Sequence, residues 1–192
     1  MSVDPILRLA APSAQRLARL IVAGLAAACT VAPSTAPSVA PTVSPGSTDC
    51  PIVERQTNLI SDRLVAVRVE TGVVADRVVF TFGIRSTAPT RPALRIAEVQ
   101  PPFSRGASGL PVVVEGRRFL DVRFDGLLLF DAAGTPALSG DRDLHPNGLA
   151  IREVVNLDES EGVSDWVLGL SSGGCVEVSS PLPIELVVTV AH

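Results

Sequence analysis

The feature that most limits how this chain can fold is a set of short stretches in which every second residue is apolar. Such stretches occur at 65–70, 78–83 and 119–124, and this is the period of a β-strand that buries one face. Further strands are expected at 93–99, 112–115, 150–157, 166–170, 175–178 and 184–190. Glycine and proline separate the stretches about every ten residues. The sequence therefore predicts an all-β fold, a β-sandwich of short, mostly antiparallel strands.

Helical signals are weak throughout the same region. A short helix or turn is expected only at 139–145 or at 57–64, and no window sustains the 3.6-residue period of a longer helix. The folded domain is expected to span residues 50–192. That length suits one domain with a sizeable core.

The first 28 residues have the order of a secretory signal peptide. Residues 1–19 carry three arginines against the single acid Asp4, and the uncharged apolar run 20–28 follows directly. This run is too short to cross a bilayer, which takes about 20 apolar residues. Basic, apolar and then small residues predict export, followed by removal of residues 1–28.

A cysteine follows the predicted cleavage point. The stretch from Leu25 to Cys29 resembles the lipobox of bacterial lipoproteins, which implies that the Cys29 thiol receives a diacylglycerol anchor. Residues 29–49 are rich in Pro, Ser, Thr and Ala, and such a segment forms an extended tether rather than a core. The expected location is the outer face of the cytoplasmic membrane. The alternative is secretion, because the alanines at 26–28 also fit the A-x-A cleavage rule.

The charge of the chain argues against one class of partner. The chain has 16 basic residues, all of them Arg, and a formal net charge of −4. Removal of the basic signal peptide makes the mature protein more acidic still. Nucleic acid is not an expected partner, because its binding needs clustered basic residues.

Four segments carry an ordered set of strand motifs. They are Asp76–Phe82, Phe119–Phe124, Asp165–Leu170 and Pro183–His192. This set resembles the successive signatures of the AMIN-like domain family, which occurs in exported proteins and lipoproteins of actinobacterial type. The related AMIN domain accompanies cell-wall amidases, forms a β-sandwich and directs the enzyme to peptidoglycan. The resemblance implies a non-catalytic module that binds peptidoglycan or another component of the cell envelope.

Two cysteines are left once Cys29 is assigned to the lipid. Cys50 and Cys175 form an even pair in an oxidising compartment, where disulfides persist, so a bridge between them is expected. The alternative is two unpaired thiols. A bridge would also exclude a nucleophile pair of Cys175 with His145, which needs a free thiolate.

No catalytic motif stands out in the sequence. His145 and His192 are the two histidines, and no Gly-x-Ser-x-Gly turn frames a serine. His192 is interpreted as a polar residue that caps the last strand. No enzyme activity and no cofactor are expected. The first alternative function is a protein-interaction adaptor for an envelope enzyme or transporter, and the second is a secreted hydrolase that uses acidic residues.

Two acidic clusters are weak candidates for a metal site. The first consists of Asp141, Asp143 and His145, and the second of Asp158, Glu159, Glu161 and Asp165. Carboxylate oxygens are ligands that Ca²⁺ accepts, but neither cluster has the spacing of an EF-hand. The preferred interpretation is solvated surface acids, and no metal is expected.

Trp166 and Arg77 are the candidate ligand-binding residues. An exposed Trp166 could stack on a sugar ring, although a tryptophan within an apolar strand is more typical of a core. Arg77, like the pair Arg117 and Arg118, could contact an anionic group. The alternative for all three arginines is an ordinary solvated or ion-paired surface.

Overall fold

The structure is a computed structural model that describes residues 50–55, 57–83 and 91–192. The predicted signal peptide, the lipid-attachment residue Cys29 and the tether at 29–49 lie outside the described residues. All of the described residues belong to one compact unit. The described part of the chain contains no helix long and apolar enough to cross a membrane.

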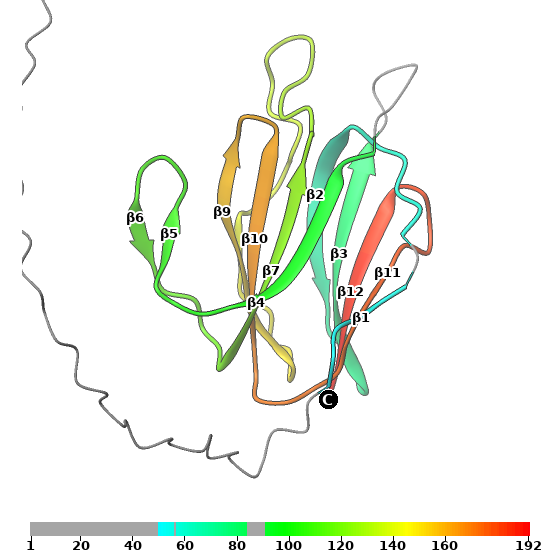
Figure 1. Cartoon of the computed structure of the whole chain (residues 1–192), viewed down its shortest axis with the longest axis vertical. Helices are drawn as coiled ribbons and strands as arrows, with labels where there is room; N and C mark the ends of the chain where they lie inside the picture. Colours follow the sequence, from blue (N-terminus) through cyan, green and yellow to red (C-terminus); the bar gives the residue numbers. More distant parts are fainter. Residues whose placement is uncertain (1–49, 56, 84–90) are drawn as a thin grey trace, which may run out of the picture. The chain divides into compact units, whose positions relative to one another are not determined.

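Two five-stranded sheets face each other (Figure 1). The first sheet has the order β1-β11-β12-β3-β2. Its strands are β1 (Val53–Glu54), β2 (Arg63–Glu70), β3 (Ala75–Gly83), β11 (Val176–Ser179) and β12 (Glu185–Ala191). Neighbouring strands are antiparallel, except that β1 runs parallel to β11.

The second sheet has the order β4-β7-β10-β9-β8 and is antiparallel throughout. Its strands are β4 (Ala93–Val99), β7 (Arg118–Asp125), β8 (Asp143–Leu144), β9 (Ile151–Ser160) and β10 (Val163–Leu170). The predicted all-β sandwich is confirmed, and most of the predicted strands lie where the alternation placed them.

A small hairpin adds a layer that the sequence analysis did not predict. Strands β5 (Phe103–Arg105) and β6 (Leu110–Val112) pair with each other beside the second sheet. A second apolar cluster fills the space between the hairpin and the outer face of that sheet. It contains Phe103, Val114, Phe119, Val155 and Val167. The strand expected at 112–115 therefore lies earlier, at 110–112.

The main core lies between the two sheets and is built from the alternating residues. Phe80 of β3 packs edge-to-face against Phe124 of β7 and Trp166 of β10, with ring centroids 5.2 and 6.0 Å apart. Trp166 has no exposed surface, and its indole N–H donates to Ser164 Oγ at 2.9 Å. The core interpretation of Trp166 is confirmed. The alternative of an exposed stacking residue is wrong, because both faces of the ring are covered.

The expectation of a short helix at 139–145 or 57–64 is wrong. Every regular element that the structure describes is a strand, and both segments are extended or irregular. Gly140 has a φ of 94°, in the left-handed region. The Ser139 N–H donates to the Val65 carbonyl, and the Ser61 hydroxyl donates to the Gly83 carbonyl. These polar groups bond to neighbouring strands instead of within a helical turn.

The disulfide between Cys50 and Cys175 is present, as predicted, with the two Cα atoms 4.9 Å apart. It fastens the start of the domain to the segment that leads into β11, next to the parallel pairing of β1 with β11. Because the Cys175 thiol is bonded, a nucleophile pair with His145 is excluded.

Asp76 connects the two sheets from a fully buried position. Its carboxylate accepts hydrogen bonds from the N–H groups of Ala150 and Ile151, at 2.7 and 3.1 Å, where β9 begins. His192 Nε2 lies 3.3 Å from the same carboxylate, and His192 Nδ1 lies 3.1 Å from the Val73 carbonyl. Burial raises the pKa of Asp76, but the backbone hydrogen bonds outweigh it and hold the pKa below its usual value. His192 thus has a structural role at the end of β12, in agreement with its interpretation as a cap.

Candidate functional site

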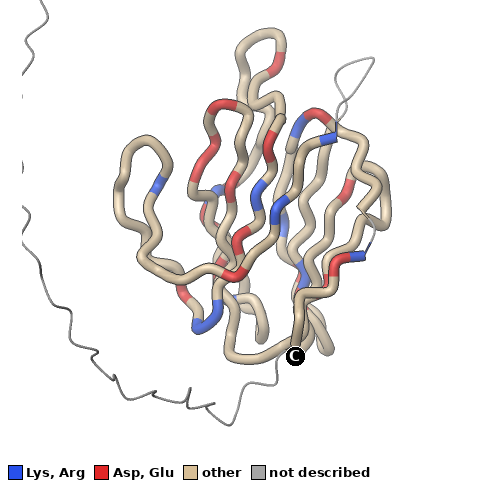
Figure 2. Tube along the Cα trace, viewed as in Figure 1, with Lys and Arg blue, Asp and Glu red and all other residues tan. Residues whose placement is uncertain are grey.

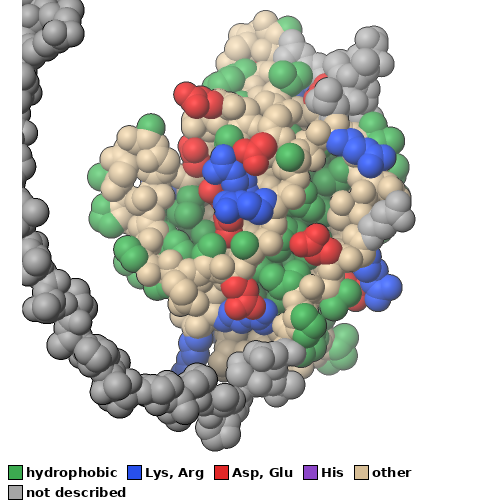
Figure 3. Space-filling model, viewed as in Figure 1, with side chains coloured by type: hydrophobic (Ala, Val, Ile, Leu, Met, Phe, Trp, Pro, Cys, Tyr) green, Lys and Arg blue, Asp and Glu red, His purple; other side chains and the backbone are tan. Residues whose placement is uncertain are grey.

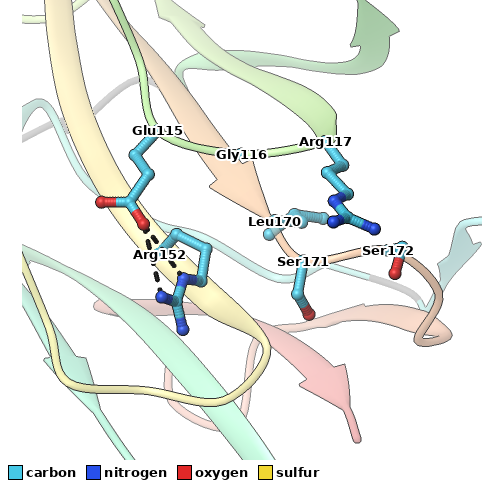
Figure 4. A pocket seen from close by; sticks show the side chains of 7 residues that line it. All are labelled: Glu115, Gly116, Arg117, Arg152, Leu170, Ser171 and Ser172. Carbon is cyan, nitrogen blue, oxygen red and sulfur yellow. Dashed lines mark hydrogen bonds and ion pairs between the residues drawn. The ribbon is translucent and has the colours of Figure 1, made fainter.

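A cavity of about 390 Å³ opens where the segment before β7 meets the segment after β10 (Figure 4). It is lined by Glu115, Gly116, Arg117, Arg152, Leu170, Ser171 and Ser172. We call it the arginine pocket. Among these residues, the sequence analysis named only Arg117 as able to bind a ligand, because the lining comes from three separate segments of the chain.

Two glycines let the backbone segments of the arginine pocket approach closely. A Cβ added to Gly116 would lie 2.9 Å from Gly169 Cα, and one added to Gly169 would lie 2.0 Å from the Glu115 carbonyl oxygen. Neither distance is tolerated between non-bonded heavy atoms. The pairing of β10 with β9 also shifts register between Gly169 and Leu170. Glycine at both positions is therefore a condition for the shape of the pocket.

Backbone hydrogen bonds fix the walls of the arginine pocket. The Arg117 N–H donates to the Leu170 carbonyl at 2.8 Å, and the Ser171 N–H donates to the Ala150 carbonyl at 2.8 Å. The Glu115 N–H donates to the buried side chain of Glu153. The pocket is consequently held by the second sheet rather than by its own side chains.

Some charged side chains of the arginine pocket have ion-pair and hydrogen-bond partners, and others have none. Arg152 lies 3.3 Å from Glu115 and donates to the Gly148 carbonyl at 3.2 Å. Figure 4 shows this ion pair on one side of the pocket and the Arg117 guanidinium on the other. Arg117 forms no ion pair or side-chain hydrogen bond with any residue that the structure describes. The same holds for the hydroxyls of Ser171 and Ser172. One cation and two hydroxyl donors are thus free to bind a ligand.

A second cavity, of about 480 Å³, lies on the outer face of the first sheet. It contains Arg77, the predicted ligand-binding residue, which makes no ion pair or side-chain hydrogen bond among the described residues. Three acids, Glu70, Glu177 and Glu185, line the same cavity. Arg68 lines the cavity too and pairs with Glu70 and Glu185. The lining therefore carries three acids and two bases, and its net negative charge disfavours an anion beside Arg77.

A charge network crosses the outer face of the second sheet. Figure 2 marks basic and acidic positions along the strands, and Figure 3 shows basic and acidic side chains next to one another on the surface. Arg95 lies 2.7 Å from Asp121, and Arg123 lies 3.6 Å from Asp165. Asp121 and Asp165 are diagonal neighbours on β7 and β10. Burial, followed by the hydrogen bond and the negative charge of Asp121, raises the pKa of Asp165 to about 7, against the opposing effect of the two arginines.

The acidic residues that were weak metal candidates have separate interactions. In the first cluster, Asp143 pairs with Arg105 at 2.7 Å and His145 lies 3.4 Å from Glu153. In the second cluster, three acids have partners of their own: Asp158 accepts from Ser160, Glu159 pairs with Arg142, and Asp165 belongs to the charge network. Within the described ranges, no three His, Cys, Asp or Glu side chains are close enough to hold a metal ion together.

The comparison with protein families agrees with this architecture. The model of the AMIN-like domain matches residues 62–192, a range that contains every strand except β1. Comparison with curated proteins and with solved structures found no match. The family match covers well over half of the chain and includes the whole second sheet, the other four strands of the first sheet, the hairpin and the arginine pocket. This chain belongs to the AMIN-like domain family.

Proposed function

We propose that this protein is a lipid-anchored, non-catalytic module that binds a cell-wall polymer outside the cytoplasmic membrane. Membership of the AMIN-like family suggests a cell-wall-associated binding module in an exported protein. The disulfide fits an oxidising compartment. The observation that carries the proposal is the arginine pocket, because it presents an unpaired cation and free hydroxyls on a domain that is otherwise acidic.

Cys29 is the proposed site of lipid attachment. One acyl chain binds a membrane only marginally, so a diacyl anchor is what stable attachment requires. A tether of residues 29–49 in an extended conformation, at about 3.1 Å per residue, would let the domain reach several nanometres from the membrane. The test is detergent phase partitioning of the native protein and of Cys29→Ala. Native protein in the aqueous phase would favour the A-x-A alternative.

Wall binding is tested by co-sedimentation with purified peptidoglycan. Residues 50–192 are suitable for this test because they contain every described strand, both apolar clusters and the disulfide. Binding should survive physiological salt, where the Debye length is about 8 Å, because an acidic module does not bind wall polymer by bulk charge attraction. Arg117→Ala should reduce sedimentation. Arg91→Ala should not, because it removes an exposed arginine that lies outside the pocket and has no ion pair with a described residue.

The adaptor function has one observation in its favour. Strand β4 is an edge of the second sheet and pairs on one side only, with β7. An edge strand can accept a strand from a partner protein. Absence of sedimentation at low and physiological salt would overturn wall binding and favour this alternative. Ala97→Pro, which alters the β4 backbone, should then abolish co-purification with the envelope enzyme or transporter.

A hydrolase would need two carboxyl groups beside a substrate site. Asp121 and Asp165 do lie together, but they belong to the charge network and line neither described cavity. Turnover of purified wall fragments by residues 50–192 would contradict the proposed non-catalytic role.

A further inference from the structure

We propose that the arginine pocket binds the terminal carboxylate of a cell-wall peptide, with Arg117 as the residue that pairs with its charge. The inference rests on the proposed function and names the chemical group that the pocket recognises. It follows from which donors in the pocket are free, how they are held, and which ligands the remaining lining disfavours.

Most described arginines of this domain are paired with an acid, whereas Arg117, like Arg77 and Arg91, has no acidic partner among the described residues. Arg95, Arg118 and Arg142, for example, each lie within 2.8 Å of a carboxylate oxygen. Arg117 has no such partner among the described residues, although the domain carries more acids than bases. Its backbone is fixed by the hydrogen bond from its N–H to the Leu170 carbonyl, so the side chain starts from a fixed point on the wall of the pocket. A cation held without an internal counter-ion is available to a ligand anion.

The two serines complete a set of donors that suits a carboxylate. The arginine fork can donate two parallel N–H groups to the two oxygens of one carboxylate. The hydroxyls of Ser171 and Ser172 can each donate one further hydrogen bond. Ser171 is held by its N–H bond to Ala150, and Figure 4 shows Ser172 on the same side of the pocket as Arg117. A carboxylate placed there has donors for both of its oxygens.

The side of the pocket opposite Arg117 disfavours a ligand that carries more than one negative charge. Glu115 lies there, paired with Arg152 at 3.3 Å and 65% exposed. The charges of Glu115 and Arg152 offset each other, so the lining of the pocket carries a net charge of +1, which a single carboxylate neutralises. The Glu115 carboxylate can also accept a hydrogen bond from a peptide N–H. This wall favours a monoanionic peptide end over a phosphate dianion.

The lining also argues against a sugar ring as the primary ligand. None of the seven lining residues is aromatic, so the pocket offers no ring on which a sugar could stack. Its volume of about 390 Å³ lies at the small end of the range for ligand sites. The pocket can hold the last residues of a peptide, while the rest of a polymer stays outside.

The test is an NMR titration of ¹⁵N-labelled residues 50–192 with N-acetyl-D-alanyl-D-alanine. Three comparison ligands are the same peptide as its C-terminal amide, the L,L peptide and inorganic phosphate. The D,D carboxylate should shift the amide signals of Gly116, Ser171 and Ser172. The C-terminal amide and phosphate should bind at least 10-fold more weakly. The L,L peptide should bind no more tightly than the D,D peptide, because the proposal assigns the pocket to wall peptides, which end in D-residues.

Variants then identify the charge partner. Arg117→Gln should weaken binding of the D,D carboxylate at least 10-fold, while the matched control Arg91→Gln should bind as tightly as the wild type. Dispersed amide spectra of both variants would show that the fold is intact. Unchanged affinity in Arg117→Gln, equal binding of the C-terminal amide, or tighter binding of phosphate or of the L,L peptide would overturn the proposal.

The proposed function and this inference can fail separately. Sedimentation with peptidoglycan that persists in Arg117→Gln, together with no peptide titration, would overturn the pocket assignment and leave wall binding in place. Saturable binding of the D,D peptide by a domain that does not sediment would support the pocket assignment and contradict binding to the assembled wall.

Discussion

Replacing Asp165 by Asn should stabilise the domain above pH 7 and change its stability little near pH 4. Asp165 Oδ1 is buried and accepts no hydrogen bond, while the carboxylate of Asp121 lies beside it. The charged form of Asp165 is therefore unfavourable, whereas a protonated Asp165 can donate to Asp121. Asparagine keeps a donor at this position through its amide N–H and never becomes charged.

The magnitude follows from linkage between protonation and folding. The pKa of Asp165 is raised to about 7 in the folded protein, from about 3.9 in an unfolded chain. The folded state consequently holds an extra proton between these values, and the stability of the wild type falls as the pH rises from about 4 to about 7. About three pH units at 1.36 kcal/mol each give an upper bound of about 4 kcal/mol. Solvent access to the carboxylate reduces this, so we expect about 1–3 kcal/mol.

The assay is urea unfolding at pH 4, 6 and 8, followed by the fluorescence of the buried Trp166. Asp165→Asn should be more stable than the wild type at pH 8 by about 1–3 kcal/mol, and the difference should shrink towards pH 4. Asp141→Asn is the matched control, because it removes the same charge from an exposed residue without a described partner. Equal stability of Asp165→Asn and the wild type at all three pH values would refute the reasoning.

Three further changes test the fold. Cys175→Ser removes a disulfide that joins residues 125 positions apart. It should lower the free energy of unfolding by about 2–5 kcal/mol relative to the oxidised wild type. Equal denaturant midpoints of the two proteins would contradict this. Asp76→Ala leaves the buried N–H groups of Ala150 and Ile151 unsatisfied and should cost about 2–5 kcal/mol in the same assay. Gly169→Ala should displace the segment before β7, and NMR should show this as shifted amide signals of residues 115–117. An unchanged spectrum would contradict the close contact between Gly169 and the Glu115 carbonyl.

Much of the fold could be predicted because its signals are local. The alternation at 78–83, 119–124 and 166–170 reflects the two faces of single strands, which any strand with one buried face displays. The pairing of Cys50 with Cys175 followed from an even count and an oxidising compartment. The ordered strand motifs carried the family resemblance, which the match to residues 62–192 confirms.

The charge network and the arginine pocket could not be predicted from single segments. Asp121 and Asp165 become neighbours only through the register of β7 against β10. Arg117 and Arg152 face one cavity because separate strands end at the same place. The only local signals for this site were Gly116 before one predicted strand and the serines at 171 and 172 after another. Glycine and serine are common in turns, so these residues did not single out a binding site.

The sequence by itself determined the strand content, the disulfide and the family, because each depends on residue order or count along the chain. The tertiary structure alone decided that Trp166 is enclosed by the core, that Asp76 joins the two sheets, and that β5 and β6 form an extra layer. It also decided which arginines have acidic partners and which do not. These properties depend on which strands pair and in what register, and that is set by packing between residues distant in sequence.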